Sequence, residues 1–372
     1  MNLKSLSGWY LENDSFCNGR TKELKKSIRV LVVDDSAWMR KIISETINDI
    51  PGLTCVGKAR NGQVALDMIE KVKPDVMTLD MEMPVLNGLE TLKHLNEMAH
   101  RPLKVIMISS VDDQRTTVDA LELGAVDFIK KPLNLARTYE QFKSKLKNHI
   151  TILFEDKMKP KKMERKIEPT IPIMVAKVNE PQALKAIVIG ASTGGPKALV
   201  TVIQSLPKEL DVPVLIVQHM PEGFTASFSE RLNQLAEVPV FEAIDGMPIQ
   251  AGVVYVAPGG WHMLVKDGKI RLNKQNKLHG VRPAVDYLFD SAATQYGNGL
   301  VGVILTGMGR DGTAGCRSIL KHGGYTIAQN QETSVVFGMP ASAIKEGTIN
   351  KVAGLEDISL LLNKMVVNKS WN

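Results

Sequence analysis

A serine flanked by small residues follows a short apolar run near the middle of the chain. The apolar run is Ala186–Ile189, and the residues after it are Gly190-Ala191-Ser192-Thr193-Gly194. Gly190, Ser192 and Gly194 match the G-x-S-x-G turn between a strand and a helix, which holds a serine hydroxyl exposed. N–H groups at the start of the following helix could stabilise a negative charge on a reacting carbonyl oxygen. This pattern predicts that Ser192 is a nucleophile.

Two further residues could complete a catalytic triad with Ser192. His219 ends the next apolar run, Val214–Gln218, and Asp311 lies just beyond a third run at Leu300–Leu305. A serine hydroxyl needs a base, and the carboxyl ends of parallel strands share one edge of a sheet, so we expect the three side chains to meet. Taken singly, Ser192 could cap a helix, His219 could be a packed histidine, and Asp311 could form a turn. Their joint positions favour catalysis, because triads are recognised by roles and not by order.

A dinucleotide-binding loop is the competing interpretation of the same segment. Gly190 and Gly195 fit the outer positions of G-x-G-x-x-G, but Ser192 replaces the middle glycine, where the backbone must approach a pyrophosphate. The next predicted strand ends in Gln218-His219, without the acidic residue that would bind a ribose. The segment therefore favours a hydrolase.

A second set of polar residues follows apolar runs in the first part of the chain. Asp34 and Asp35 end the first run, Asp80 ends the third, Ser109 the fourth and Lys131 the fifth. Clustered carboxylates attract a cation, and carboxylates with water and a carbonyl suit Mg²⁺. A carboxylate beside that metal can take up a phosphoryl group, which Ser109 and Lys131 would contact. The plain alternative is that the Asp-Asp pair caps the next helix.

Strand and helix signals alternate twice along the chain, which predicts two α/β domains, each with a doubly wound parallel sheet. The strands expected in the first domain are Ile28–Val33, Thr54–Lys58, Val76–Leu79, Val105–Ile108 and Asp127–Ile129, with helices at 37–48, 62–71, 88–98 and 114–121. The strands expected in the second are Ala186–Ile189, Val214–Gln218, Val253–Ala257, Leu300–Leu305 and Tyr325–Ala328, with helices at 196–205, 224–234, 285–295 and 313–321.

Length and composition agree with two soluble domains and exclude several classes of protein. The chain has 372 residues, of which 44% are hydrophobic and 23% charged, with a formal net charge of +6. The three cysteines lie far apart, which fits no disulfide framework or zinc spacing, so we expect a cytoplasmic protein. No apolar run reaches the ~18 residues of a membrane span, and the N-terminus does not resemble a signal peptide. We expect a flexible extension at 1–27, a first domain at 28–150, a Pro- and Lys-containing linker at 151–183 and a second domain at 184–372.

Residues 28–150 resemble a response-regulator receiver domain, which has a flavodoxin-like fold. The matching segments are Val33-Asp34-Asp35-Ser36, Leu79-Asp80-Met81-Glu82-Met83-Pro84, Ile108-Ser109-Ser110 and Lys130-Lys131-Pro132. The resemblance implies that Asp80 accepts the phosphoryl group from a histidine kinase. It also implies that Asp35, Asp80 and the Glu82 carbonyl hold Mg²⁺, with Asp34 helping through water. Asn87 is a departure, because an acidic residue is common there, but Asn also suits a turn.

Residues 184 to about 365 resemble the catalytic domain of chemotaxis response-regulator protein-glutamate methylesterases/protein-glutamine glutaminases, which is Rossmann-like with three layers. The matching segments are Ile189–Pro196, Gln218–Thr225, Tyr255–Gly259, Arg282–Asp286 and Thr306–Gly312. The resemblance implies a phosphorylation-activated serine hydrolase that removes methyl esters from glutamates of chemoreceptors as methanol and deamidates specific glutamines. Its triad falls on Ser192, His219 and Asp311, and no cofactor is implied for this reaction. Backbone N–H groups near Thr193 and Met308 are candidates for the oxyanion hole.

Two interpretations from other classes remain. The chain could be a phosphorylation-dependent adaptor that binds receptors without turnover, although an intact set of Ser192, His219 and Asp311 argues against it. A DNA-binding output domain is disfavoured because no recognition motif is present, and we expect no nucleic-acid partner. The linker would let the first domain fold back over the serine site, so we expect the unphosphorylated first domain to cover Ser192.

Overall fold

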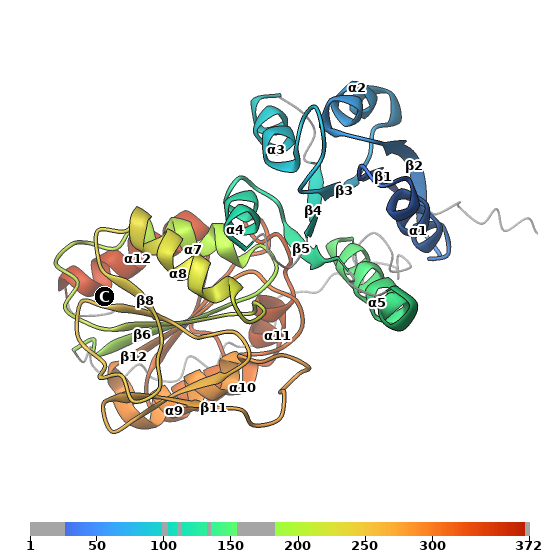
Figure 1. Ribbon diagram of the computed structural model, residues 1–372. Helices are drawn as coiled ribbons and strands as arrows, with labels where there is room; N and C mark the ends of the chain where they lie inside the picture. Colours follow the sequence, from blue (N-terminus) through green and yellow to red (C-terminus); the bar gives the residue numbers. More distant parts are fainter. Residues whose placement is uncertain (1–26, 99–102, 110–113, 132–134, 155–182, 369–372) are drawn as a thin grey trace, which may run out of the picture.

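The computed structural model describes residues 27–98, 103–109, 114–131, 135–154 and 183–368. The expected N-terminal extension, up to residue 26, and most of the expected linker therefore lie outside the described residues. Two bodies are visible in Figure 1, each with a central sheet, and helix α4 of the first lies against helices of the second.

The first domain has a parallel sheet in the order β2-β1-β3-β4-β5. Its strands are β1 (Ile28–Val33), β2 (Leu53–Ala59), β3 (Val76–Asp80), β4 (Lys104–Ser109) and β5 (Asp127–Lys130). Its helices are α1 (Ala37–Asn48), α2 (Gly62–Val72), α3 (Gly88–Glu97), α4 (Gln114–Glu122) and α5 (Leu135–Leu153). All five predicted strands and four predicted helices are present. Helix α5 was not predicted.

Alternation along β1 explains why helices cover both faces of this sheet. Val30 and Val32 pack in one core with α1 and α5, whereas Leu31 and Val33 pack in another with α2, α3 and α4. The hydroxyl of Ser36 accepts a hydrogen bond from the Met39 N–H at 3.3 Å and so caps α1 as expected. The fold therefore directs the carboxyl ends of β1, β3 and β5 to one edge.

The second domain has a seven-stranded parallel sheet in the order β14-β13-β12-β6-β7-β9-β8, with a separate antiparallel pair, β10-β11. Its strands are β6 (Ala186–Ala191), β7 (Val214–Gln218), β8 (Val240–Glu242), β9 (Val254–Val256), β10 (His262–Lys266), β11 (Lys269–Asn273), β12 (Leu300–Ile304), β13 (Tyr325–Gln329) and β14 (Lys351–Ala353). Its helices are α7 (Gly195–Gln204), α8 (Phe224–Leu235), α9 (Val285–Tyr296), the 3₁₀ helix η1 (Gly297–Gly299), α10 (Thr313–Lys321), α11 (Met339–Lys345) and α12 (Leu355–Asn368).

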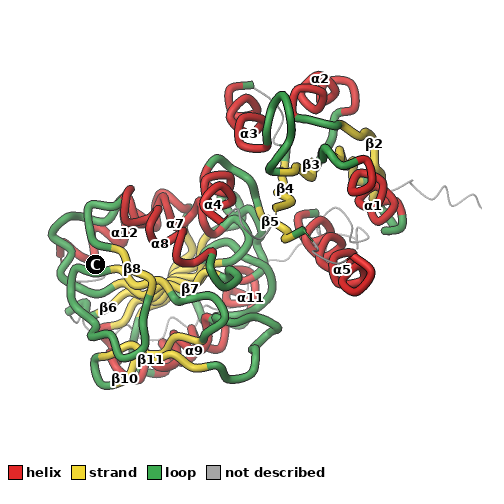
Figure 2. Tube along the Cα trace, viewed as in Figure 1, coloured by secondary structure: helices red, strands yellow, loops and turns green. Residues whose placement is uncertain are grey.

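Helices lie on both faces of the second sheet, giving three layers (Figure 2). Helices α7, α8 and α12 share one buried core, and α9, α10, α11 and the β10-β11 pair share the other. The predicted fold class, two α/β domains with doubly wound parallel sheets, is confirmed. The sequence prediction missed β8, β14, the β10-β11 pair, α11 and α12.

None of the helices in the described part of the chain is long and apolar enough to cross a bilayer.

Candidate active site

Ser192 lies in a sharp turn between β6 and α7. Its N–H donates to the Thr306 carbonyl at 3.0 Å, and its carbonyl accepts from the Gly195 N–H at 2.7 Å. Gly194 has a φ of +75°, in the left-handed region that favours glycine. A Cβ on Gly307 would lie 2.7 Å from the Ser192 Cβ, so only glycine lets the two loops approach this closely. The turn therefore has the strand–turn–helix context predicted for a nucleophilic serine.

His219 and Asp311 are brought together by the neighbouring strands. β6 lies between β7 and β12, at the point where the order of the strands reverses, which is where ligands bind in open α/β sheets. His219 follows β7, and Asp311 lies in the loop after β12. The His219 Nε2 and Asp311 Oδ2 atoms are 2.8 Å apart. The structure thus pairs the predicted base with the predicted acid.

Asp311 is held by the first turns of two helices. Its Oδ2 accepts the Val285 N–H at 2.7 Å, and its Oδ1 accepts the N–H groups of Asp286 at 3.1 Å and Gly312 at 3.0 Å. Burial by itself would raise the pKa of Asp311, but the imidazole of His219 and the N–H groups of Val285 and Asp286 hold it below the ordinary value. Asp311 is therefore an ionised, fixed partner for His219.

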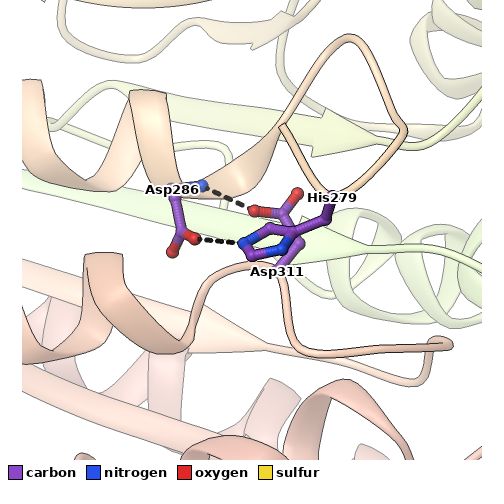
Figure 3. A group of neighbouring side chains, drawn as sticks. All are labelled: His279, Asp286 and Asp311. Carbon is purple, nitrogen blue, oxygen red and sulfur yellow. Dashed lines mark hydrogen bonds and ion pairs between the residues drawn. The ribbon is translucent and has the colours of Figure 1, made fainter. Parts of the chain in front are cut away.

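A second carboxylate mirrors this arrangement. Asp286, in the first turn of α9, accepts the N–H of Gly315 in α10 at 2.7 Å, and its other oxygen lies 3.1 Å from the Nε2 of His279. Figure 3 shows His279, Asp286 and Asp311 side by side, with the Asp286 N–H directed to Asp311. A Cβ on Gly315 would contact the Phe289 Cβ, so glycine is what lets α10 come close enough to α9. Asp311, in the loop before α10, thus caps α9, and Asp286, on α9, caps α10.

One cavity holds the predicted catalytic residues. Its lining includes Ser192, Thr193, His219, Met308 and Asp311. Among the hydrogen bonds of the described residues, none joins the Ser192 hydroxyl to His219. Because Nε2 of His219 contacts Asp311, Nδ1 is the ring nitrogen left to take a proton. The backbone N–H groups of Thr193 and Met308 donate none of the backbone hydrogen bonds found in the described chain.

Sequence reasoning missed two residues that shape this cavity from behind. Gln218, only 2% exposed, donates from Nε2 to the carbonyls of Ser192 at 3.0 Å and His219 at 3.2 Å, so one amide spans the turns that carry both residues. The Thr306 hydroxyl donates to the Thr193 carbonyl at 2.9 Å. Gln218 could have been found from the sequence, because it is a polar residue at the end of a buried strand.

The acidic residues of the first domain also converge. Asp34 and Asp80 are buried, Asp35 is exposed, and ligand oxygens of all three lie within 4.8 Å of one another. The Lys131 Nζ is 2.6 Å from Asp80 Oδ2 and 3.4 Å from Asp34 Oδ2. Burial raises the pKa of Asp80 to about 6. The negative charge of Asp34 acts in the same direction, and Lys131 acts against both. Two buried carboxylates with one ammonium leave an excess of negative charge.

This excess fits a bound cation such as Mg²⁺. Within the described residues, Asp34 Oδ2 and Asp80 Oδ2 are buried and lack a hydrogen bond of good geometry, although the Lys131 ammonium is near. Glu82 is exposed and lines a cavity with Asp35 and Asn87. Asn87 caps α3 in a capping box with Glu90, which accounts for the amide at this position. The backbone of Ser109 ends β4, but its side chain lies outside what the structure describes.

The first domain forms part of the wall around Ser192. Asp127, Phe128, Ile129 and Lys130 of β5, with Lys145 and His149 of α5, line the same cavity as the triad. The Thr193 hydroxyl donates to Asp127 Oδ2 at 2.6 Å, and the Gly194 N–H donates to the Val126 carbonyl at 3.0 Å. His149 Nδ1 lies 3.0 Å from the same Asp127 oxygen. The residues beside the candidate nucleophile are thus bonded to the other domain.

Further contacts between the domains lie beside this cavity. The rings of Phe128 and Phe224 stack with centroids 4.6 Å apart. The Arg231 guanidinium makes two bonds to the Glu122 carboxylate, at 2.7 and 2.9 Å. Helix α4 packs on α7 and α8 (Figure 1). In this arrangement the first domain covers one side of the serine site.

Comparison with known proteins matches both parts of the chain. The family model described as response regulator receiver domain matches residues 30–143, and the one described as CheB methylesterase matches residues 187–362. A protein-glutamate methylesterase/protein-glutamine glutaminase of Pyrococcus abyssi is 42% identical over 350 residues, covering 90% of this chain and 92% of that protein. A protein of the same name from Halalkalibacterium halodurans is 43% identical over 345 residues, covering 90% and 97%. The crystal structure of the Thermotoga maritima CheB methylesterase catalytic domain is 45% identical, covering 50% of this chain and all of that one, with a TM-score of 0.48.

Replacing Asp311 by Ala should lower the free energy of unfolding of the second domain by about 2–4 kcal/mol. The change removes the acceptor of three backbone N–H groups and the partner of His219. Calorimetric unfolding of the full chain measures the loss. Asp290→Ala is the matched control, since that exposed carboxylate bonds only the Ser318 hydroxyl among described groups. Equal losses in both variants would contradict the capping role of Asp311.

Replacing Asp80 by Asn should remove a pH dependence from the stability of the first domain. The pKa of Asp80 is raised from 3.8 to about 6, so this group's contribution to stability is present in acid and is lost as the pH rises through that interval. Without divalent cations, the free energy of unfolding of the variant should exceed that of the wild type by at most about 3 kcal/mol at pH 7, and by less at pH 4.5. Calorimetry at both pH values measures this, with Asp67→Asn on α2 as the control. A difference that does not change with pH would contradict the buried, charged state of Asp80.

Proposed function

This chain belongs to the protein-glutamate methylesterase/protein-glutamine glutaminase family with an N-terminal receiver domain, and we propose a reaction path through Ser192, His219 and Asp311. The Ser192 Oγ attacks the γ-carbonyl of a glutamyl methyl ester while His219 takes the hydroxyl proton. Asp311 orients the imidazole and stabilises its cation. The N–H groups of Thr193 and Met308 stabilise the oxyanion. The single observation that carries this proposal is the shared cavity of Ser192 and the His219–Asp311 pair.

The same path serves both activities of the family. In ester hydrolysis the tetrahedral intermediate expels methanol, which takes the proton from His219. In glutamine hydrolysis it expels ammonia instead. Both leave an acyl group on Ser192, and a water molecule activated by His219 then releases the glutamate carboxylate and restores the hydroxyl. No cofactor is needed, because every proton transferred passes through His219.

Regulation of this hydrolase resides in the receiver domain. We assign residues 28–150 to the receiver, 151–183 to the linker and 184–372 to the catalytic domain, with helix α5 ending at Leu153. In this proposal Asp80 takes the phosphoryl group from a chemotaxis histidine kinase. Asp35, Asp80 and the Glu82 carbonyl would hold Mg²⁺, with Asp34 acting through water, and the ion would offset the negative charge of the acceptor. Lys131 and Ser109 would contact the phosphoryl oxygens.

Phosphorylation acts on this hydrolase, in our proposal, by releasing the receiver from the serine site. One short strand, β5, links the two places. Lys131, next to its C-terminal end, contacts Asp80, and Asp127, at its N-terminal end, accepts the Thr193 hydroxyl. A phosphoryl group that draws Lys131 toward itself would therefore pull on the strand that covers the cavity. Opening would give the glutamyl side chains of chemoreceptors access to Ser192 from the cytoplasm.

Ser192→Ala should abolish methanol release from methylated chemoreceptors, because no other group in the proposed path attacks the ester. A fall of at least a thousandfold is expected from the loss of a nucleophile that works as a unit with its base. Methanol release with receptor-containing membranes, acetyl phosphate and Mg²⁺ measures the rate.

The matched control is Ser205→Ala, a serine at the end of α7 that bonds the Val202 carbonyl. It should retain full activity. Retained turnover in Ser192→Ala would refute the triad. Receptor binding without turnover in the wild type would instead support the adaptor interpretation.

Arg231→Ala should raise the activity of the unphosphorylated full chain about fivefold. The partly exposed pair of Arg231 with Glu122 joins the two domains, and losing it should shift the closed state toward the open one by roughly 1 kcal/mol. The activity with acetyl phosphate should change little, because that state is already open. Initial rates of methanol release with and without the phosphodonor measure both.

Arg317→Ala is the matched control, because its partner Glu346 lies in the same domain. This variant should leave both rates unchanged. Occlusion would be wrong if Arg231→Ala had no effect on the unphosphorylated rate and if residues 184–372 alone were no more active than the unphosphorylated full chain.

A further inference from the structure

The active-site cavity contains a second His–Asp pair that the proposed reaction path does not use. His279 Nε2 lies 3.1 Å from Asp286 Oδ2, close to the 2.8 Å that separates His219 Nε2 from Asp311 Oδ2. Both imidazoles line the cavity of Ser192. The Asp286 N–H joins the pairs by donating to Asp311 Oδ1 at 3.1 Å (Figure 3).

His279 is held in place by a backbone conformation that few side chains adopt. It is the first central residue of a two-residue turn, closed by hydrogen bonds of 3.2 and 3.0 Å between Leu278 and Val281. Its φ is +53°, and that of Gly280, the second central residue, is +80°. A residue with a side chain in this region commonly costs about 1 kcal/mol, and Gly or Asn would be favoured. A histidine in this unfavourable conformation suggests a functional role for its side chain.

Asp286 needs the group that His279 supplies. The carboxyl is only 7% exposed, and burial, followed by the charge of Asp311, raises its pKa, while the Gly315 N–H and His279 lower it only in part. Among the described side chains, His279 is the one that hydrogen-bonds Asp286. Without His279, the two buried carboxylates would lie close together at the first turn of α9, and only Asp311 would keep an imidazole partner, His219.

We propose that His279 is a positioning residue for this hydrolysis. Its imidazole hydrogen-bonds Asp286 and keeps that carboxylate in place, and Asp286 in turn fixes the first turn of α9, whose N–H groups direct Asp311 toward His219. The inference rests on the proposed triad and adds a residue that acts through Asp286 without touching the substrate.

The test compares His279→Ala and His279→Gln in the full chain with acetyl phosphate and Mg²⁺. His279→Ala should lower kcat about tenfold, the effect of one lost hydrogen bond to a charged group, with KM within about twofold. His279→Gln can still donate a hydrogen bond and should regain most of the kcat. The split between kcat and KM, together with the rescue by Gln, distinguishes a positioning residue from one that contacts the substrate.

His322→Ala, on an exposed imidazole that bonds the Ser318 carbonyl, is the matched control and should change neither quantity. In an Asp286→Asn background, His279→Ala should have little further effect, because the two residues act in series. The inference is overturned if His279→Ala alters only KM, leaves kcat unchanged, or adds its full effect to Asp286→Asn. Ser192→Ala separates the outcomes: retained activity there refutes the proposed function, whereas its loss with an unaffected His279→Ala refutes only the role of His279.

Discussion

The active site depends on two helices of the catalytic domain that meet at their N-termini. The first N–H groups of an α-helix have no acceptor within the helix. Here Asp311 accepts those of α9, and Asp286 accepts one of α10. Two buried carboxylates this close would repel each other in an apolar interior. The helix N-termini supply compensating positive charge, and each carboxylate also has an imidazole nitrogen within hydrogen-bond distance. The position of Asp311, and through it the orientation of His219, therefore follows from helix packing more than from the loop that carries the residue.

Residues at strand ends were predictable, because parallel strands deliver their carboxyl ends to one edge whatever their separation in sequence. His219 and Asp311 are 92 residues apart and still meet. Two of the strands missed, β8 and β14, have three residues each, too short for alternation to be visible. The other two, β10 and β11, form a separate antiparallel pair outside the alternation of strands and helices. His279 is only seven residues from Asp286, yet no pattern connects them, because their contact depends on a turn and on the capping of one helix by another. The contacts between domains were equally hidden, since they depend on how two finished surfaces fit together.

β5 contributes to both sites, which is the basis of the proposed link between Asp80 and Ser192. The strand has four residues. Lys131, just after it, contacts Asp80, and Asp127, at its start, accepts the hydroxyl of Thr193, the residue after Ser192. Burial would lower the pKa of His149, but the Asp127 carboxylate raises it above the ordinary value. The Asp127 oxygen that accepts the Thr193 hydroxyl is also 3.0 Å from His149, so this covering contact is held from within the receiver.

The composition of the interface between the two domains suits the release of the receiver that we propose. Apolar residues of α4 pack against α7 and α8, and one aromatic pair stacks, which gives the closed state some of its stability. The ion pairs around them, Arg231 with Glu122 and Arg115 with Glu230, are partly or largely exposed and contribute about 1 kcal/mol or less each. A wholly apolar interface would resemble a permanent one, and a phosphoryl group could not displace it. The hydrogen bonds from Thr193 and Gly194 to the receiver lie next to Ser192. In the proposed regulation they place the covering where it blocks chemistry, while the exposed ion pairs keep the interface weak enough for a single phosphorylation to open it.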